Sequence, residues 1–373
     1  MTSLKSPHHL IVRRCSAAVA LAFLSLPGLA QTAAAPVGAA AADDANTSTL
    51  ESIQVSADWL GSGLQNSVKR FPGARTVVRK EEIENSGASN IGDVMRRIPG
   101  VQSTDNSGTA GSAISLNIGV RGLTGRYSPR STVLLDGIPM AVAPYGQPQL
   151  SFAPVSLNNI EAIDVVRGGG AVRYGPQNVG GIINFKTRSI PTEPGFNGDA
   201  SVRYNSYSGG ESNKQYSAFV GSQLDNGLGL ALLYSGSDGS SWRAGSRETV
   251  NDFALKFRYQ LTPASEFYGK VSYYDVNSRT PGGLTVAQYN ADPFQNTRPT
   301  DYWSGTRKGI DAGYLNTLSA TQEFEVRTYY NESFRQSVLI SGANLVHQPR
   351  NYEVLGIEPR YTQRFNLGQT TND

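Results

Sequence analysis

The chain has 373 residues, with 33 basic and 30 acidic side chains and a formal net charge of +3 at pH 7. Residues 1–30 contribute three of the basic residues, Lys5, Arg13 and Arg14, and none of the acidic ones, so the rest of the chain is balanced. A balanced chain gives no electrostatic reason to expect a nucleic-acid partner. The single cysteine, Cys15, lies within the same thirty residues, which excludes disulfides and cysteine-ligated metal sites from the remainder.

Residues 1–30 have the pattern of a secretory signal peptide. Their basic start is followed by the short apolar run Cys15 to Leu26, and residues 27–30 (PGLA) offer a small-residue cleavage site. The run is too short for a transmembrane helix, and the alternative is a buried N-terminal helix. Residues 31–50 are rich in alanine and have no period that could build a core, so they are predicted to be a disordered leader.

The leader is followed by a short alternating segment that can form one extended strand: Glu51, Ser52, Ile53, Gln54, Val55 and Ser56. An extended segment that follows a flexible leader can add as a strand to the edge of a partner's sheet, through main-chain hydrogen bonds. The segment is therefore a candidate docking element.

Residues 70–190 are predicted to form a compact mixed α/β domain. Ser89 or Asn90 can cap a helix that Pro99-Gly100 ends, and the apolar face of this helix is Ile91, Val94, Met95 and Ile98. Strands are expected at residues 132–135, 160–166 and 181–185, and Asp136-Gly137 forms a turn after the first of them.

From residue 198 onward the pattern changes to strict alternation. One face of a strand carries Phe253, Leu255, Phe257 and Tyr259, and the other carries Ala254, Lys256, Arg258 and Gln260. Such segments fit the strands of a transmembrane barrel, although a soluble β-sandwich also alternates. No apolar run after residue 30 reaches 18 residues, so a β-barrel is the membrane-spanning structure that remains.

The expected connections distinguish these two folds. Short turns are predicted near residues 225–227, 262–264 and 317–320, and long stretches at about 236–250, 276–308 and 336–350. Alternating short and long connections are typical of outer-membrane barrels. Residues 198–373 supply roughly eight strands, whereas barrels with a plugged lumen have about 22. The expectation is therefore an α+β domain followed by the incomplete N-terminal part of a barrel, in a fragment or an early-terminated chain.

Five ordered motifs carry a family resemblance. They are residues 118–123 (IGVRGL), 131–139 (STVLLDGIP), 160–168 (IEAIDVVRG), 172–176 (VRYGP) and 180–184 (GGIIN). In this order they resemble the plug domain of TonB-dependent receptors. The resemblance implies a plug inside a 22-stranded barrel in the bacterial outer membrane, and it makes Glu51, Ser52, Ile53, Gln54 and Val55 the TonB box. The glycines lack the context of a nucleotide-binding loop.

Within this family the likeness is greatest to receptors for ferric dicitrate. It is carried by residues 143–151 (APYGQPQLS), 281–284 (PGGL), 349–352 (PRNY) and 356–361 (GIEPRY). The resemblance places ligand contacts on Thr109, Gln147, Arg335 and Arg350. Ferric dicitrate is a polyanion, and the guanidinium fork of arginine matches carboxylates. The alternative for an arginine inside a barrel is a wall residue paired with an acid.

The resemblance implies TonB-dependent import of a ferric chelate, with TonB and its inner-membrane energising complex as partners and outer-membrane lipid as surroundings. No covalently bound cofactor, protein metal site, enzyme activity or nucleic-acid partner is expected; His347 is the one histidine outside the signal peptide. Receptors for ferric dicitrate carry an N-terminal domain that signals to a transcription regulator, and because only residues 31–50 lie between the expected cleavage site and the box, this domain is not expected here. The alternatives are a receptor for another siderophore, a passive porin and a non-functional fragment.

Overall fold

The computed structural model describes residues 74–103, 116, 118–123, 131–140, 142–143, 147–148, 155–168, 179–363, 365–367 and 370–372. All of them belong to one compact unit of the chain, Gln54–Asp373. The predicted signal peptide, leader and TonB box, and Thr109, lie outside the described residues. No helix among the described residues is long and apolar enough to cross a membrane.

The first part of the fold is an α/β domain built on a five-stranded sheet. The strand order is β1 (Ala74–Arg79), β8 (Ile160–Arg167), β9 (Gly181–Thr187), β4 (Thr132–Leu135) and β5 (Ile138–Pro139). β4 and β9 are parallel, and the other neighbours are antiparallel. The three strands predicted from the sequence are thereby confirmed. Two short hairpins pair β2 (Val101–Ser103) with β3 (Ile118–Val120), and β6 (Val142–Ala143) with β7 (Gln147–Pro148).

In the described part of this domain three short helices accompany the sheet: α2 (Lys80–Asn85), α3 (Ile91–Met95) and the 3₁₀ helix η1 (Leu157–Asn159). The Asn90 side chain accepts a hydrogen bond from the backbone N–H of Asp93 at 2.9 Å, which confirms the predicted cap of α3. The predicted helix face is buried in the core of the domain together with the β8 and β9 side chains Ile163, Ile183 and Phe185. The helix ends at Met95, earlier than Pro99 requires.

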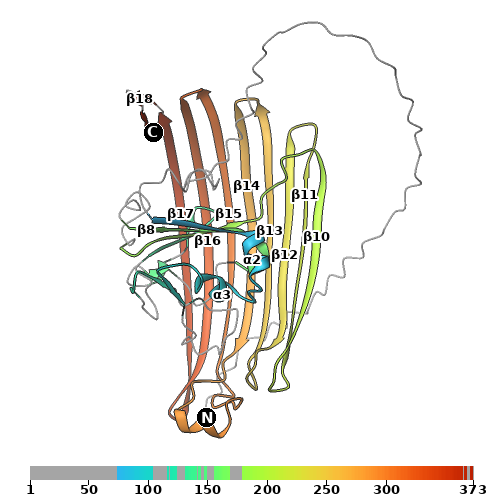
Figure 1. Cartoon of the computed structure of the whole chain (residues 1–373), viewed down its shortest axis with the longest axis vertical. Coiled ribbons are helices and arrows are strands. Elements are labelled where there is room, and N and C mark those ends of the chain that lie inside the picture. The colour runs from blue at the N-terminus through green and yellow to red at the C-terminus, as the bar shows by residue number, and fades with distance from the viewer. Residues whose placement is uncertain are drawn as a thin grey trace, which may run out of the picture. The chain divides into compact units, whose positions relative to one another are not determined.

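The second part of the fold, here called the long sheet, has eight antiparallel strands, and each pairs with the next along the chain (Figure 1). The strands are β10 (Gly195–Ser206), β11 (Ser212–Gln223), β12 (Leu228–Ser240), β13 (Arg247–Thr262), β14 (Ser265–Arg279), β15 (Tyr302–Ser319), β16 (Gln322–Ser341) and β17 (Asn344–Gln363). A hairpin of β18 (Phe365–Leu367) and β19 (Thr370–Asn372) follows. The predicted fold class, a plug-like α+β domain followed by roughly eight barrel strands, is confirmed.

The long sheet has one apolar and one polar face, as the alternation predicts. On the apolar face Phe253, Leu255, Phe257 and Tyr259 are 36%, 41%, 37% and 43% exposed, while their neighbour Ala254 is 5% exposed on the other side. The polar face carries buried charged groups such as Lys270, Glu325 and Arg327. An exposed apolar face opposite a buried polar one fits lipid outside and a polar interior within a barrel.

Two of the three long connections expected from the sequence are wrong. Residues 236–250 and 336–350 are mostly strand, and only residues 241–246 and 342–343 connect their hairpins. The ladders are continuous through these residues, to Ser240–Arg247 between β12 and β13 and to Ser341–Asn344 between β16 and β17. The third is a long connection of residues 280–301, which contains α4 (Val286–Ala291). These connections share one end of the sheet, the loop end; the tight turns 224–227, 263–264 and 320–321 mark the other.

Candidate functional site

Arg335 and Arg350 are direct cross-strand partners on β16 and β17. The hairpin that brings them together is closed by the two-residue turn Gly342–Ala343, where Gly342 has φ +61°, a conformation that glycine adopts without steric cost. Partners in an antiparallel ladder point to the same face. Both arginines therefore lie on the polar face near the loop end, and not on either side of a long loop as the sequence suggested.

Two like charges directly opposite each other weaken a strand pair unless a counter-charge joins them. Arg335 is 8% exposed, whereas Arg350 is exposed. Among the residues that the structure describes, no acid pairs with the Arg350 guanidinium. Arg350 therefore does not fit the alternative of a barrel-wall arginine neutralised by an acid. Together the two arginines concentrate positive charge, and the forked donors of a guanidinium suit carboxylates.

Trp303 lies beside Arg335 on the neighbouring strand β15. The guanidinium carbon of Arg335 is 3.8 Å from the centroid of the Trp303 ring. The residue directly opposite Arg335 on β15 is Gly305, which has no side chain to fill the space between the two groups. The guanidinium consequently stacks on the ring face. The sequence analysis missed Trp303, although its alternation with Gly305 and Arg307 places it on the polar face.

The two predicted contacts from the α/β domain are not tested. Gln147 is in β7, where the structure describes the backbone but not the side chain, and Thr109 lies outside the described residues. Their convergence on the arginine pair stays a prediction.

A second polar cluster joins the α/β domain to the long sheet through Asp136, in the turn between β4 and β5. Lys270 Nζ of β14 lies 2.5 Å from Asp136 Oδ2, and Lys256 Nζ of β13 lies 3.9 Å from Oδ1. Thr187 donates its backbone N–H and its hydroxyl to the same carboxylate, both at 2.7 Å. Burial alone would raise the pKa of Asp136, but the two ammonium groups outweigh it and hold that pKa well below its ordinary value.

Arg327 of β16 extends this cluster, here called the Asp136 latch. Its guanidinium donates to the backbone carbonyls of Asp136 at 3.2 Å and Gly137 at 2.9 Å, and it also pairs with Glu358 at 2.6 Å. Three strands of the long sheet therefore hold one tight turn of the α/β domain. The sequence marked Asp136-Gly137 only as a turn, because no local pattern identifies which lysines approach it.

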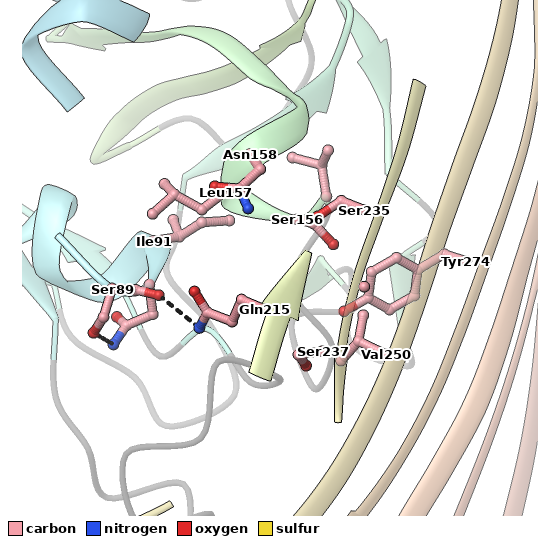
Figure 2. A pocket seen from close by; sticks show the side chains of 13 residues that line it. Ser89, Ile91, Ser156, Leu157, Asn158, Gln215, Ser235, Ser237, Val250 and Tyr274 are labelled. Atoms are coloured by element: carbon pink, nitrogen blue, oxygen red, sulfur yellow. Dashed lines mark hydrogen bonds between the residues drawn. The ribbon is translucent and has the colours of Figure 1, made fainter. Parts of the chain in front are cut away.

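Contacts on the β10–β12 side include a partly exposed ion pair, in which Lys80 Nζ of α2 lies 3.9 Å from Asp199 Oδ2 of β10. Arg203 donates to the carbonyl of Ala88 at 2.9 Å, and Gln215 to that of Ser89 at 3.3 Å. Figure 2 shows Gln215 pointing toward Ser89 beside a cavity that Ser235, Ser237 and Tyr274 also line. Its volume of about 40 Å³ gives room for water but is too small for a metal chelate.

The loop end is organised by Arg243, which lies between β12 and β13. Its guanidinium donates to the carbonyls of Pro281, Gly282 and Gln295, so it joins the beginning of the 280–301 connection to the segment after α4. Trp242 packs edge-on against Phe294 of the same connection, with ring centroids 6.2 Å apart. The described part of this loop region is therefore built from specific contacts.

Comparison with known proteins places these features in a family. Residues 67–182 match the model of the TonB-dependent Receptor Plug Domain. The vitamin B12 transporter BtuB of Photobacterium profundum is 33% identical over 194 residues, 50% of this chain and 29% of that protein. BtuB of Vibrio vulnificus is 26% identical over 250 residues, which cover 67% of this chain and 36% of that protein.

Solved structures of outer-membrane transporters and receptors are also similar to this chain. The unliganded ferric citrate transporter FecA is 45% identical, with a TM-score of 0.78, covering 84% of this chain and 48% of that one. The siderophore receptor PirA of Acinetobacter baumannii has a TM-score of 0.63 at 20% identity, covering 81% of this chain and 46% of that one, which shows a shared fold.

The chain spans less than half the length of each of these proteins. They are transporters and receptors rather than enzymes, in agreement with the expectation from the sequence. The α/β domain is the plug domain, and the long sheet corresponds to the strands that follow it in these structures. The chain belongs to the TonB-dependent receptors of the outer membrane.

Proposed function

We propose that this protein takes part in TonB-dependent uptake of a ferric chelate across the outer membrane, and that the chelate is ferric dicitrate. The observation that carries the proposal is the Arg335–Arg350 pair, two guanidinium groups in direct cross-strand register on the polar face near the loop end. Citrate carboxylates supply the counter-charge that this pair lacks at Arg350. Arginine binds carboxylates through two parallel hydrogen bonds, which gives orientation as well as affinity.

The comparison that supports this cargo is the 45% identity to the ferric citrate transporter FecA. The vitamin B12 transporters match at lower identity and over less of the chain. Two adjacent guanidinium groups favour a small polyanion over an uncharged or weakly charged ligand, because the gain from each charge-assisted hydrogen bond depends on an anionic acceptor. Thr109 and Gln147 are proposed to add neutral hydrogen bonds from the plug.

The proposed transport step couples this site to the cell interior. Ferric dicitrate binds at the loop end, and TonB, energised by its inner-membrane complex, pairs with the segment Glu51 to Val55 as an added strand. Tension on that segment acts on the plug, which the Asp136 latch holds against β13, β14 and β16. Opening a path requires contacts between plug and sheet to break. On the β10–β12 side these are hydrogen bonds to the carbonyls of Ala88 and Ser89 and the partly exposed Lys80–Asp199 pair, which are weaker than the buried pairs of Asp136.

The direct test is ligand binding to the purified protein in detergent, with the Arg350→Gln variant beside the unchanged chain. Loss of one charge-assisted contact is expected to weaken ferric dicitrate binding on the order of 10- to 100-fold. Arg247→Gln is the matched control, because Arg247 is an exposed loop-end arginine paired with Asp238. Equal affinity in the Arg350 variant would refute the assignment of the site.

The same assay decides between cargoes. A ferric catecholate and cyanocobalamin are titrated in parallel with ferric dicitrate. Tight binding of either of them, insensitive to Arg350→Gln, would replace ferric dicitrate as the cargo. Uptake that does not depend on TonB would favour a passive porin.

A further inference from the structure

We propose that Trp303 is a positioning residue of the anion site, and that it acts by holding the Arg335 guanidinium flat so that its N–H donors meet a carboxylate edge-on. This inference rests on the proposed function, because it deepens the account of the same site. Trp303 contributes no donor to the ligand in this proposal; it acts through Arg335.

The placement of Trp303 follows from the strand register. Trp303 pairs with Ser337 and Gly305 pairs with Arg335, so the indole is the diagonal neighbour of the guanidinium on the polar face. A diagonal neighbour is within reach of aromatic and long side chains. The glycine at position 305 leaves the intervening space open, and the guanidinium carbon lies 3.8 Å above the ring centroid. At that distance the guanidinium lies over the ring in a cation–π contact.

The contact with Trp303 opposes the electrostatic repulsion between the two arginines. Arg335 and Arg350 stand directly opposite each other, and their repulsion favours rotamers that turn the two guanidinium groups apart. The ring attracts the cation through its π face and restricts the Arg335 side chain to one plane. All of the guanidinium N–H bonds lie in that plane, so a ring stacked on the face does not cover the N–H edge, while it removes rotamer freedom before the ligand arrives.

The experiment is a double-mutant cycle on the binding of ferric dicitrate to the purified protein. Trp303→Leu keeps an apolar side chain without a π face and is expected to weaken binding about 3- to 30-fold. Trp303→Phe keeps a ring and is expected to recover most of the affinity. In the Arg335→Gln background Trp303→Leu is expected to change affinity less than twofold, because the group that it positions is gone.

A separate variant tests the same idea without altering Trp303. Arg335→Lys keeps the charge but loses the planar group that stacks, so it is expected to weaken binding about as much as Trp303→Leu, and the two changes together are expected to be less than additive. Heat-modifiability on gels checks that each variant is folded.

The outcomes separate the two proposals. If Arg335→Gln and Arg350→Gln weaken binding but Trp303→Leu does not, the positioning role is refuted while the proposed function stands. Equal effects of Trp303→Leu in both backgrounds would show a structural role that does not pass through Arg335. If none of the arginine variants alters binding, the proposed function itself fails.

Discussion

Asp136 of the plug and Lys270 of β14 form an ion pair of 2.5 Å between Oδ2 and Nζ, although they are 134 residues apart in the sequence. The Lys270 side chain is 7% exposed and that of Asp136 is 21% exposed. Removing either partner of such a poorly solvated ion pair destabilises the folded protein, because the remaining group stays charged and desolvated. This asymmetry makes the pair suited to hold a plug in one position.

Replacing Asp136 by Asn is expected to weaken the attachment of the plug. Lys256 and Lys270 would remain beside a neutral amide, and breaking a buried pair in this way costs about 3 kcal/mol. Hydrogen exchange of the β4 and β9 amides in the detergent-solubilised protein measures the free energy of opening. Asp199→Asn is the control, because Asp199 is 47% exposed in its pair with Arg188, and its loss should cost less than about 1 kcal/mol. Equal protection in both variants would contradict the latch.

The Asp136 latch is expected to resist mild acid. Its carboxylate has a pKa below the ordinary value of 3.8, so its stabilising contribution is complete above that value and is lost only as pH falls through the depressed pKa. Protection of the β4 and β9 amides, corrected for the intrinsic exchange rate, should therefore not change between about pH 7 and pH 5 through this group. A loss of protection in that range that disappears in Asp136→Asn would show that the pKa is not depressed.

Arg243 is expected to fix the 280–301 connection. Arg243→Leu removes every hydrogen bond from this guanidinium to the carbonyls of Pro281, Gly282 and Gln295. Proteolytic cleavage between residues 282 and 300 should become several-fold faster, because local opening then requires fewer contacts to break. Arg247→Leu, in the same hairpin but in an exposed ion pair with Asp238, should leave the cleavage rate unchanged. Cleavage at the same rate in both variants would show that other contacts hold the loop.

Gly181 is expected to tolerate no side chain. It has φ +142°, and a Cβ atom there would lie 2.1 Å from the backbone oxygen of Val166 on β8. Gly181→Ala should therefore separate β9 from β8 and leave the plug sensitive to protease. Gly283→Ala has no atom within 4 Å of its Cβ and should be silent. A stable Gly181→Ala plug would contradict the register of these two strands.

Local patterns predicted much of the fold. The alternation of Phe253 to Tyr259 gave the two faces of β13, because lipid and polar surroundings select side chains with a period of two. The cap at Asn90 and the strands of the plug were equally local. The lengths of the β12–β13 and β16–β17 hairpins could not be predicted from local patterns, since ladder pairing past residues 236 and 336 depends on the neighbouring strand.

The candidate site also has parts that could be predicted from the sequence and parts that could not. Arg335 and Arg350 came from resemblance, and the structure adds their direct pairing, which depends on the turn at Gly342. The stack on Trp303 and the meeting of Asp136 with Lys256 and Lys270 could not be predicted from one sequence. They join segments whose distance is set by the register of the whole sheet and by the position of the plug.

Ferric dicitrate is proposed to bind the arginine pair and to be imported with energy supplied by TonB. Uptake of ⁵⁵Fe-labelled citrate by cells that depend on this protein measures both steps together. The unchanged protein is compared with Arg350→Gln and with Ile53→Pro, which removes a main-chain donor from the predicted TonB box. Ile53→Pro is expected to abolish uptake but to leave ferric dicitrate binding intact, while Arg350→Gln is expected to reduce both. Uptake at the unchanged rate in both variants would contradict this proposal.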